Sequence, residues 1–433
     1  MIRYKMELTD EEKEILAGKQ GPTLQKVMES VVLYGDAFGA KRLVEIEGPV
    51  HLVTSFGIPI LKPVYQMMDE LIEADISTKQ PFTVDPRPID HKNVKSNILQ
   101  KLVFRFMYGK QKDYEEQLKK IGLKDDQAFT CTCYLDQVGN RPKKGQILAW
   151  AESSAVVFAN SVLGARTNRN SAIIELLSGV LGKTPEFGLL TEEGRRAKWK
   201  VKLETSKLPN AQVLGSAVGM KVMEDVPYII GLDKFLGKGM KKATEDYLKD
   251  LGAASASNGA VGLFHVENIT PEAVEEGRGL LPTDHKTYVI DDQEIERVIK
   301  SYPVIWKKKT AKPKVAFIGC PHLSLRQLYD WTDKIESALK DTGKRKVKVR
   351  TVLSAAPDVV EEFKKDVQAY KRLTDTGATL TSICPLMYMN NPLSGRQAVI
   401  TNSNKLRTYT TARFLLDDQL LDAIIHRRVK EVD

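Results

Sequence analysis

The sequence predicts an α/β protein of more than one domain, with parallel sheets flanked by helices. The first observation is length, because 433 residues are too many for one ordinary hydrophobic core. The second is composition, since 42% hydrophobic and 28% charged residues are typical of a folded soluble protein and exclude wholesale disorder. The third is a regular alternation of strand-like and helix-like segments after residue 314, which indicates a parallel sheet with helical crossovers.

The first elements of the chain are predicted to be short helices and strands. Thr9 to Glu12 forms a capping-box pattern that starts a helix, glycines at 18 and 21 end it, and a second helix begins at Thr23. Beyond these, the pattern predicts a strand over 43–53 that contains His51, a helix over 64–72, a proline-stiffened loop over 82–88, a helix over 114–121 and a strand over 129–135 that carries Cys131 and Cys133.

The second half of the chain divides at a basic, proline-containing linker over 306–314, which separates an N-terminal region (1–305) from a C-terminal α/β domain (315–433). Before the linker we expect a helix over 172–181, a strand over 199–203, a helix over 243–251 and a buried strand over 260–265 that ends on His265. After it we expect strands over 315–318, 347–353, 378–383 and 398–400, with helices over 325–339 and 359–369.

Polar side chains follow the predicted strands of the C-terminal domain. Cys320, Ser354, Cys384 and the group 401–403 each come just after a strand. Ligands of parallel sheets bind beyond the carboxyl ends of the strands. The sequence therefore predicts that two cysteines and a Ser/Asn cluster converge on one rim of this sheet.

Residues 149–169 place many small and polar side chains in an apolar run. Buried polar groups need hydrogen-bond partners, so this stretch indicates either an internal network or a bound polar ligand. The plainer alternative is a capped core helix, with Ser153 or Ser154 as its N-cap and Gly164 near its C-terminus. Arg166 and Arg169 also suit a planar carboxylate or a phosphate, which guanidinium groups bind bidentately.

The charge of the chain fits a solvated face or a small anionic substrate better than nucleic acid. The net charge is +9 and the pI is about 9.0, with basic runs at 307–309 and 344–350. Elsewhere the lysines are interleaved with acidic residues, and no aromatic-basic stripe or zinc-finger spacing occurs. The chain has no apolar run of about 18 residues and no signal-peptide pattern. We therefore expect a cytoplasmic protein without nucleic-acid or membrane partners.

Four cysteines in so long a chain do not form a disulfide framework. Each of them is also compatible with an ordinary buried small side chain. Three thiolates from separate loops, without a fourth protein ligand, suit a metal site that keeps one position open. Sulfur ligands favour an iron–sulfur cluster, zinc or copper(I).

The segment ESSAVVFANSVLGARTNR (152–169) closely resembles the signature of the aconitase X family, the large catalytic portion of aconitase-like dehydratases. The resemblance continues in order through GKTPEFG (182–188), residues 251–273, IGCPHLS (318–324) and TNSNK (401–405). It implies an aconitase-like core that lacks the swivel domain and a hydro-lyase that dehydrates a small hydroxy acid, with a 3-hydroxyproline or phosphomevalonate as candidates. An aconitase-type isomerase and a non-catalytic relative that binds a metal or a partner are the alternatives.

The resemblance also implies roles for individual residues. Cys131, Cys320 and Cys384 match the positions that hold an iron–sulfur cluster or a mononuclear iron, whereas Cys133 stands where proline is frequent. His322 is a further candidate for proton transfer or for supporting a ligand. The catalytic candidates are Glu152, His265, Ser403 and Lys405, and the substrate-binding candidates are His51, Ser153, Ser154, Asn160, Arg166, Thr167, Asn168, Arg169 and Lys183.

The family pattern is not complete in this chain. The implied enzyme needs a small swivel-domain subunit of about 130 residues, which supplies a catalytic serine and docks over the rim that bears Cys320, Cys384 and Ser403. Departures from the pattern touch expected substrate contacts and leave the substrate open; they occur at 58–63, 82–86, Leu190 and 382–383.

Overall fold

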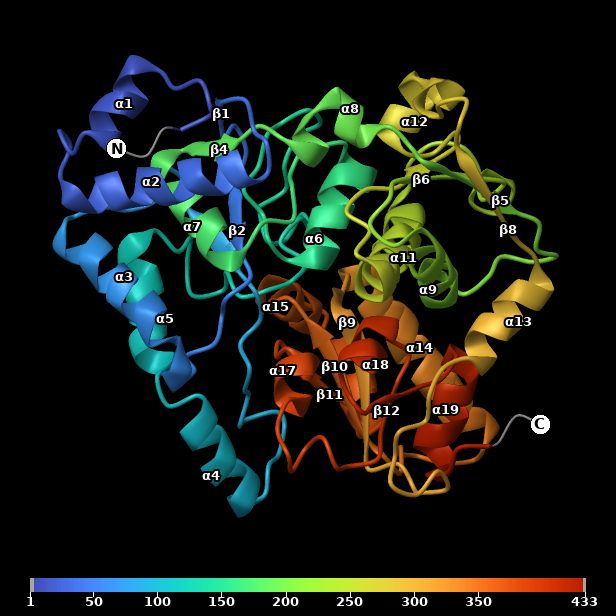
Figure 1. Ribbon diagram of the computed structural model, residues 1–433. Helices are drawn as coiled ribbons and strands as arrows, with labels where there is room; N and C mark the ends of the chain where they lie inside the picture. The colour runs from blue at the N-terminus through green and yellow to red at the C-terminus, as the bar shows by residue number, and fades with distance from the viewer. Residues whose placement is uncertain (1–3, 431–433) are drawn as a thin grey trace.

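The computed structural model describes residues 4–430 as three regions of helices and parallel sheets that meet at the centre of the molecule (Figure 1). Within this range the strands form two two-stranded sheets, one four-stranded sheet and one five-stranded sheet. Every pairing is parallel except β1 (Leu43–Glu45) with β4 (Lys183–Pro185). The predicted α/β class with parallel sheets flanked by helices is therefore confirmed.

The N-terminal region begins with the predicted capping box. The Thr9 hydroxyl accepts from the Glu12 amide at 3.3 Å, and the Glu12 carboxylate accepts from the Thr9 amide at 2.9 Å. The strand predicted over 43–53 is instead two strands in different sheets, because Gly48 and Pro49 interrupt the extended run. The elements here are α1 (Asp10–Leu16), α2 (Pro22–Ala37), β1, β2 (Val50–Leu52), α3 (Lys62–Glu73), β3 (Phe82–Val84), α4 (Ile98–Met107), α5 (Gln111–Ile121), α6 (Ser153–Phe158), α7 (Ala172–Leu181), β4 and α8 (Glu192–Arg195).

Two further predictions in this region are wrong. Residues 82–84 form β3, which pairs in parallel with β2, where a loop was expected. The strand expected over 129–135 is absent, and Phe129 makes only a single bridge to Val84. The chain turns there because the Thr132 amide donates to the Thr130 hydroxyl at 3.1 Å, a local bond that competes with strand pairing. Cys131 therefore lies in a turn.

The polar stretch 149–169 forms α6 followed by a π-helical turn over Ala159–Leu163, which Gly164 ends at a φ of 69°. The predicted N-cap at Ser153 or Ser154 is wrong by one or two residues. Glu152 caps the helix, since its carboxylate accepts from the Ala155 amide at 2.6 Å. The capping carboxylate is thus fixed at the start of a buried helix.

The middle region is a four-stranded parallel sheet in the order β7-β6-β5-β8, covered by helices. Helix α11 is its longest and packs against α9, α6 and the C-terminal helix α18, so it joins all three regions (Figure 1). The strand expected over 260–265 is reduced to β7, which begins at His265, because Ala260 ends α11 at a φ of 85°. The elements are β5 (Trp199–Leu203), α9 (Ala211–Val222), β6 (Pro227–Ile230), α10 (Asp233–Leu236), α11 (Lys242–Gly259), β7 (His265–Val266), α12 (Pro271–Glu275), β8 (Lys286–Ile290) and α13 (Asp292–Lys300).

The C-terminal region is a five-stranded parallel sheet in the order β11-β10-β9-β12-β13. The chain runs outward from β9 to one edge and then returns to β12 on the other side, so β9 and β12 flank the switch point where such sheets bind ligands. The helix predicted over 359–369 is split at Asp366, whose carboxylate caps the second part. The elements are β9 (Val315–Leu323), α14 (Leu325–Asp341), β10 (Arg350–Ala355), α15 (Pro357–Lys365), α16 (Val367–Asp375), β11 (Thr379–Thr381), α17 (Pro385–Met389), β12 (Val399–Thr401), α18 (Asn404–Tyr409), β13 (Arg413–Phe414) and α19 (Asp417–His426).

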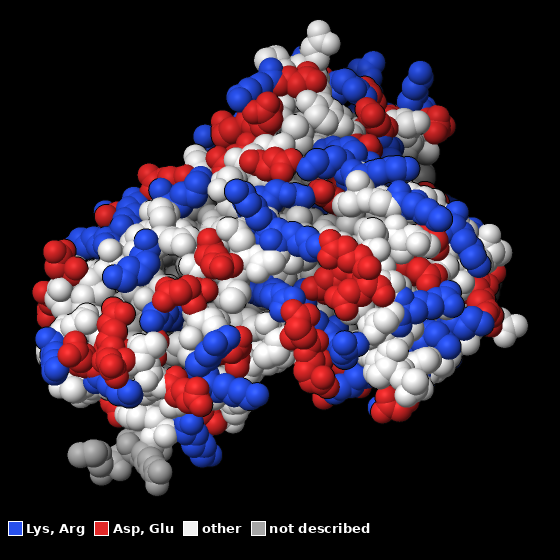
Figure 2. All heavy atoms as spheres, turned by 90° about the horizontal axis from the view of Figure 1, so that it is seen from above, with Lys and Arg blue, Asp and Glu red and all other residues white. Residues whose placement is uncertain are grey.

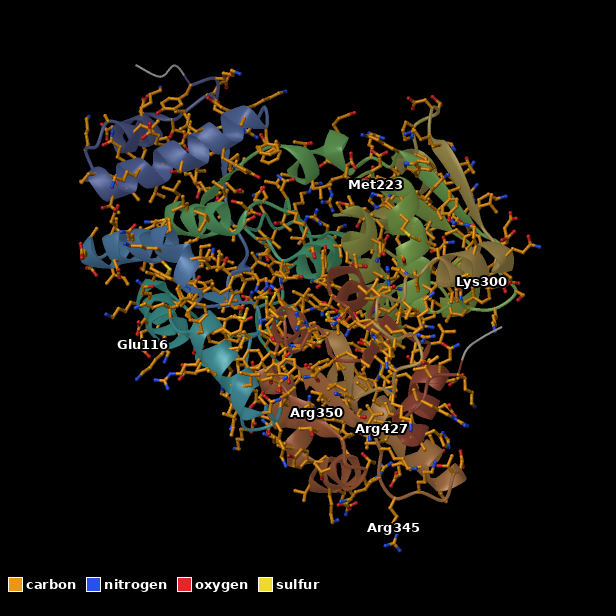
Figure 3. The ribbon with its side chains drawn as sticks, turned by 60° about the horizontal axis from the view of Figure 1, so that its bottom comes forward. Glu116, Met223, Lys300, Arg345, Arg350 and Arg427 are labelled. Carbon is orange, nitrogen blue, oxygen red and sulfur yellow. The ribbon has the colours of Figure 1, made fainter. Side chains whose placement is uncertain are left out.

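The carboxyl ends of these strands face the other two regions. Arg345, which precedes β10, lies at the outer end of the C-terminal region in Figure 3. The opposite ends of the strands therefore point toward the junction with α6 and α11. Residues 306–314, the predicted linker, contain no helix or strand.

The surface carries mixed charge. Figure 2 shows Lys and Arg interspersed with Asp and Glu over the whole face in view, without a continuous field of one sign. This distribution agrees with the sequence-based interpretation that the positive net charge is spread over solvated faces. None of the helices described over 4–430 is long and apolar enough to span a membrane.

Candidate active site

Cys320 lies in a bulge of β9 at the carboxyl end of the C-terminal sheet. The register of β9 against β10 is lost between Ile318 and Leu323. Gly319 permits the bulge because its φ is 101° and a Cβ there would lie 2.3 Å from the Ser354 carbonyl oxygen. The bulge turns the buried Cys320 away from the regular ladder.

His322 connects the loops of the three candidate metal-binding cysteines. Its Nε2 donates to the carbonyl of Ile383, the residue before Cys384, at 3.2 Å. Its Nδ1 accepts from the hydroxyl of Thr130, the residue before Cys131, at 3.0 Å. This tautomer follows because a carbonyl oxygen only accepts. Burial lowers the pKa of His322 to about 4, so the ring stays neutral near neutral pH.

Two backbone contacts complete this connection. The His322 amide donates to the Cys131 thiol sulfur at 3.4 Å. The ammonium of Lys249, a fully buried residue of α11, donates to the His322 carbonyl at 2.8 Å. The positions of the cysteine loops are therefore fixed relative to one another and to the central helix.

Glu152 and Lys405 form a buried ion pair beside the cysteines. Lys405 donates to the Glu152 carboxylate and, at 3.3 Å, to the Ser153 hydroxyl. Burial alone would raise the pKa of Glu152, but the charge of Lys405 and three hydrogen bonds outweigh it and hold the pKa below its ordinary value. Burial alone would lower the pKa of Lys405, but Glu152 and nearby thiols raise it. Both residues are therefore charged at neutral pH.

Asp85 lies near this pair just after β3, and His51 of the neighbouring strand β2 faces Asp85. The Nδ1 of His51 lies 2.9 Å from the Thr83 hydroxyl, and its Nε2 lies 3.5 Å from the Asp85 carboxylate. Those facing Nε2 and Oδ1 atoms are buried and make no hydrogen bond within the described residues. Burial raises the pKa of Asp85 to about 6, with the charge of Glu152 adding to it. The two atoms thus face each other just beyond hydrogen-bonding geometry, and buried ionisable groups with shifted pKa values are typical of functional sites.

The sequence-based candidates omitted Asp85. Its signal was present, because Asp85 directly follows β3, as a residue at the carboxyl end of a strand does. Because residues 82–88 are predicted to form a loop, the sequence does not place Asp85 at the end of a strand.

The three thiols share one electrostatic environment. Burial raises the pKa of Cys131 and Cys320, and raises that of Cys384 to about 12. The charge of Lys405 acts in the opposite direction on all three, and Cys320 interacts with both other thiols. A metal would therefore have to displace protons from neutral thiols, with Lys405 as the nearby cation that favours thiolates.

The candidate cysteines are not gathered around one ion position. Among the described residues, no three His, Cys, Asp or Glu side chains converge on one ion position. A single ion needs all its sulfur ligands at about 2.3 Å. A cluster takes its thiolates on different irons, so they lie further apart. Cys131, Cys320 and Cys384 come from three segments of the chain that His322 connects.

Asn160, Thr167 and Asn168 belong to an internal network. The Asn160 amide nitrogen donates to the carbonyls of Thr167 and Gly262 at 2.8 and 2.9 Å, and Asn168 bonds the backbone of Phe187 and Leu189. The Asn160 side-chain oxygen accepts from the Thr167 amide at 3.0 Å, so both polar atoms of this side chain are used. Of the two readings of this stretch, the internal network accounts for these residues.

A buried arginine that the sequence analysis missed lies at the centre of this network. Arg195 donates to the Asn160 side chain at 3.1 Å and to the Glu272 carboxylate at 2.6 Å. His265 also belongs to this network, because its Nε2 donates to the Arg195 carbonyl at 2.8 Å and its Nδ1 lies 3.7 Å from Glu272. The sequence offered no signal for Arg195, which stands in an ordinary charged segment (EEGRR).

The remaining anion-binding candidates are dispersed. Arg166 pairs with Glu192 at 2.5 Å, and Lys183 pairs with the buried Glu12 on the N-terminal helix at 2.9 Å. Arg169 is exposed and makes no ion pair with the described residues. Only Arg169 among these three therefore keeps an unneutralised charge for a ligand.

The serines near the ion pair make bonds that position other groups. Ser154 donates to Glu152 at 2.6 Å. Ser403 donates to the Cys320 carbonyl at 2.5 Å and accepts from the Leu406 amide at 3.1 Å, so it caps α18 and fixes the bulge. Its hydroxyl is thus already engaged in this structure.

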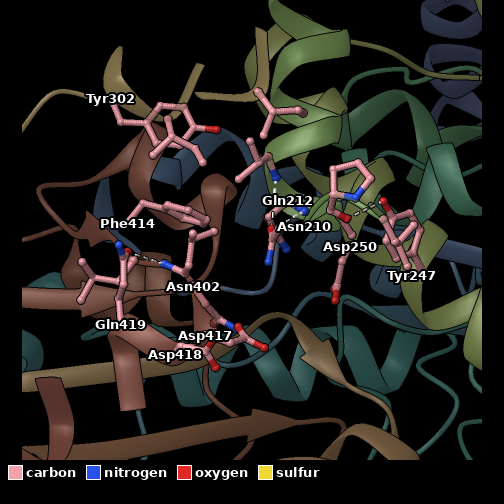
Figure 4. Close-up of a pocket in the computed structure, with 18 of the residues that line it drawn as sticks. Asn210, Gln212, Tyr247, Asp250, Tyr302, Asn402, Phe414, Asp417, Asp418 and Gln419 are labelled. Atoms are coloured by element: carbon pink, nitrogen blue, oxygen red, sulfur yellow. Dashed lines mark hydrogen bonds between the residues drawn. The ribbon is translucent and has the colours of Figure 1, made fainter. Parts of the chain in front are cut away.

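A cavity of about 1360 Å³ reaches Cys320 from the junction of the middle and C-terminal regions (Figure 4). Asn402 and Asp417 line it after β12 and β13, and their side chains are hydrogen bonded at 3.0 Å. Tyr247 and Asp250 of α11 line the facing wall. The cavity therefore gives access to Cys320 from the switch-point side of the sheet.

Comparison with known proteins places these features in context. Family models described as aconitase X first, second and third domains match residues 5–193, 195–300 and 313–417. The phosphomevalonate dehydratase large subunit of Thermococcus kodakarensis is 32% identical over 415 residues, which cover 93% of this chain and 95% of that protein. The protein of the same name from Methanocaldococcus jannaschii is 28% identical, with 93% and 95% covered.

Two other proteins extend the comparison. The cis-3-hydroxy-L-proline dehydratase of Pseudomonas aeruginosa is 24% identical over 92% of this chain and 65% of that protein. A crystal structure of the holo-form of aconitase X from Thermococcus kodakaraensis superposes with a TM-score of 0.78 at 29% identity, covering 96% of this chain and 99% of that one.

Proposed function

This chain belongs to the aconitase X family and is a dehydratase of that type, and we propose that it dehydrates phosphomevalonate as the large subunit of a two-chain enzyme. The observation that supports phosphomevalonate as the substrate is the similarity to phosphomevalonate dehydratase large subunits along 95% of their length. A cis-3-hydroxy-L-proline dehydratase is covered over only 65% of its length. Within this chain, the exposed Arg169 supports a phosphorylated substrate, because a guanidinium group binds phosphate bidentately.

We propose that Cys131, Cys320 and Cys384 hold an iron–sulfur cluster. A bound cluster with one open iron position supplies a Lewis acid for the substrate hydroxyl. His322, Ser403 and the Lys249 ammonium keep the cysteine loops in place from the protein side. The charge of Lys405 favours the thiolate forms that ligation requires.

The remaining proposed site residues act on protons and anions. Asp85, with a pKa of about 6, exchanges a proton readily near neutral pH, and His51 faces it. Glu152 and Lys405 present a fixed pair of charges beside the cysteines. We also propose Arg166, Ser153 and the other sequence-based candidates as site residues. Their support is weaker, because most of their contacts are with other residues of the protein.

We further propose that the second chain is a small swivel-domain subunit of about 130 residues that supplies the catalytic base. The relatives named large subunits support a partner. We also propose that residues 306–314 form the boundary between the N-terminal region and the C-terminal α/β domain. The four free cysteines support the cytoplasm as its compartment.

The test combines metal analysis with a substrate comparison. The chain is purified without oxygen, alone and with the small-subunit homologue from the same genome, and its iron, sulfide and visible spectrum are measured. Each preparation is then incubated with phosphomevalonate or with cis-3-hydroxy-L-proline, and loss of water is followed by mass spectrometry. Turnover of phosphomevalonate only by the two-chain preparation is expected. Turnover of the proline alone, or isomerisation without net loss of water, would refute the proposed substrate.

A further inference from the structure

Helix α4 (Ile98–Met107) has an apolar face that nothing in residues 4–430 covers. Ile98, Leu99, Leu102 and Phe106 are 88%, 56%, 63% and 81% exposed. Positions 98, 102 and 106 are four residues apart and therefore lie along one face of the helix. We call these four side chains the α4 stripe. Apolar side chains gathered in this way mark an interaction surface, whereas single exposed ones are ordinary.

The opposite face of α4 is anchored beside the candidate active site. Phe104 and Tyr108 are buried in the same apolar cluster as Cys320, against which Cys384 also packs. The Tyr108 hydroxyl donates to the Met387 carbonyl, in the helix that follows Cys384, at 2.9 Å. The stripe is therefore the outer side of a helix whose inner side contacts the cysteine loops.

The segment before α4 is also tied to the C-terminal region. Arg350, labelled in Figure 3, donates from the start of β10 to the Lys95 carbonyl. In Figure 1 α4 stands at the lower edge of the N-terminal region, next to α17. These contacts hold α4 by its inner face and by the segment before it, so the stripe keeps a fixed orientation.

The segment that carries the stripe is basic, although Lys110 at its end pairs with Asp113 at 3.1 Å. Between residues 91 and 112 the chain contains no Asp or Glu. Lys101 and Arg105 lie on α4 itself and are exposed. Charge complementarity therefore requires a partner with acidic side chains around an apolar surface. The other basic residues of the segment are Lys92, Lys95, Lys110 and Lys112.

We propose that the α4 stripe is the docking surface for the second subunit, which presents an apolar groove edged by Asp or Glu. This inference rests on the proposed two-chain function. The second subunit is the favoured occupant because relatives of this chain are named large subunits. A subunit seated on the stripe also borders the Cys384 loop that the helix holds, so docking and the active site are adjacent.

The test compares a stripe variant with a matched surface control. The variant Leu102→Gln/Phe106→Gln removes the stripe's centre, and glutamine preserves both exposure and helix propensity. The control Val367→Gln changes a side chain that is 71% exposed on α16. Dissociation constants for the small-subunit homologue from the same genome are measured by isothermal titration calorimetry. We expect the variant to bind about 30-fold more weakly, or about 2 kcal/mol, and the control to stay within about twofold of wild type.

Each other outcome overturns a defined part of the proposal. An unchanged dissociation constant in the variant overturns the docking surface. Wild-type self-association that the variant loses assigns the stripe to a second copy. Variant-sensitive binding to vesicles of phosphatidylcholine and phosphatidylserine, without effect on subunit binding, assigns it to an anionic membrane. Tight, stripe-dependent binding without dehydration overturns the proposed function and leaves the docking surface intact.

Discussion

The buried pair between Glu152 and Lys405 offers the sharpest test of how the site is held together. The pair joins α6 to α18, which are 253 residues apart in sequence, and the two side chains are 3% and 13% exposed. In Glu152→Gln the buried Lys405 ammonium loses its opposite charge and keeps only neutral acceptors, such as the Ser153 hydroxyl at 3.3 Å. Removing one member of a buried pair costs about 3–5 kcal/mol, because the other charge stays buried.

A double-mutant cycle separates the interaction between the two side chains from the other effects of each substitution on the free energy of unfolding. Glu152 also accepts from the Ser154 hydroxyl and the Ala155 amide, each at 2.6 Å, so a carboxylate left alone in Lys405→Met is partly stabilised. We therefore expect about 3 kcal/mol for Glu152→Gln, about 2 kcal/mol for Lys405→Met and about 3 kcal/mol for the double variant. The coupling energy is then about 2 kcal/mol.

The assay is urea unfolding of metal-free protein, followed by circular dichroism. Metal-free protein is used because metal binding would add its own free energy to folding. A coupling energy below about 0.5 kcal/mol would show that the two charges are independently solvated, and the assignment of the pair as a link between regions would be wrong.

Three further predictions concern other parts of the molecule. Cys384→Ser should lose bound iron while Cys133→Ala retains it, measured as iron per chain after anaerobic purification; equal iron in both would refute the ligand assignment. Arg195→Met should destabilise the fold by about 3–5 kcal/mol in urea unfolding, since it strands the Glu272 carboxylate, and an unchanged midpoint would show that the network is dispensable. Burial lowers the pKa of His265, so its contribution to stability is full above the unfolded pKa of about 6.5 and is lost as the pH falls through the lower folded pKa. Stability should therefore fall less between about pH 7.5 and about pH 5.5 in His265→Gln than in wild type.

Features set by neighbouring residues were predictable from the sequence. The capping box at Thr9, the helix over 172–181 and the alternation of the C-terminal region depend on local hydrogen bonding and on the spacing of apolar side chains. Parallel strands bring their carboxyl ends to one edge, so the proximity of Cys320 and Cys384 also followed from the order of elements. The family followed from the signature over 152–169.

Features that depend on which distant segments meet were decided only by the tertiary structure. Asp85 faces His51 because β2 and β3 pair in parallel, and Arg195 is buried because Asn160 and Glu272 meet it from elements 35 and 77 residues away. His322 contacts Thr130 across 192 residues. A buried charge or imidazole is stable only when such distant partners satisfy it, and no local pattern of residues records those partners.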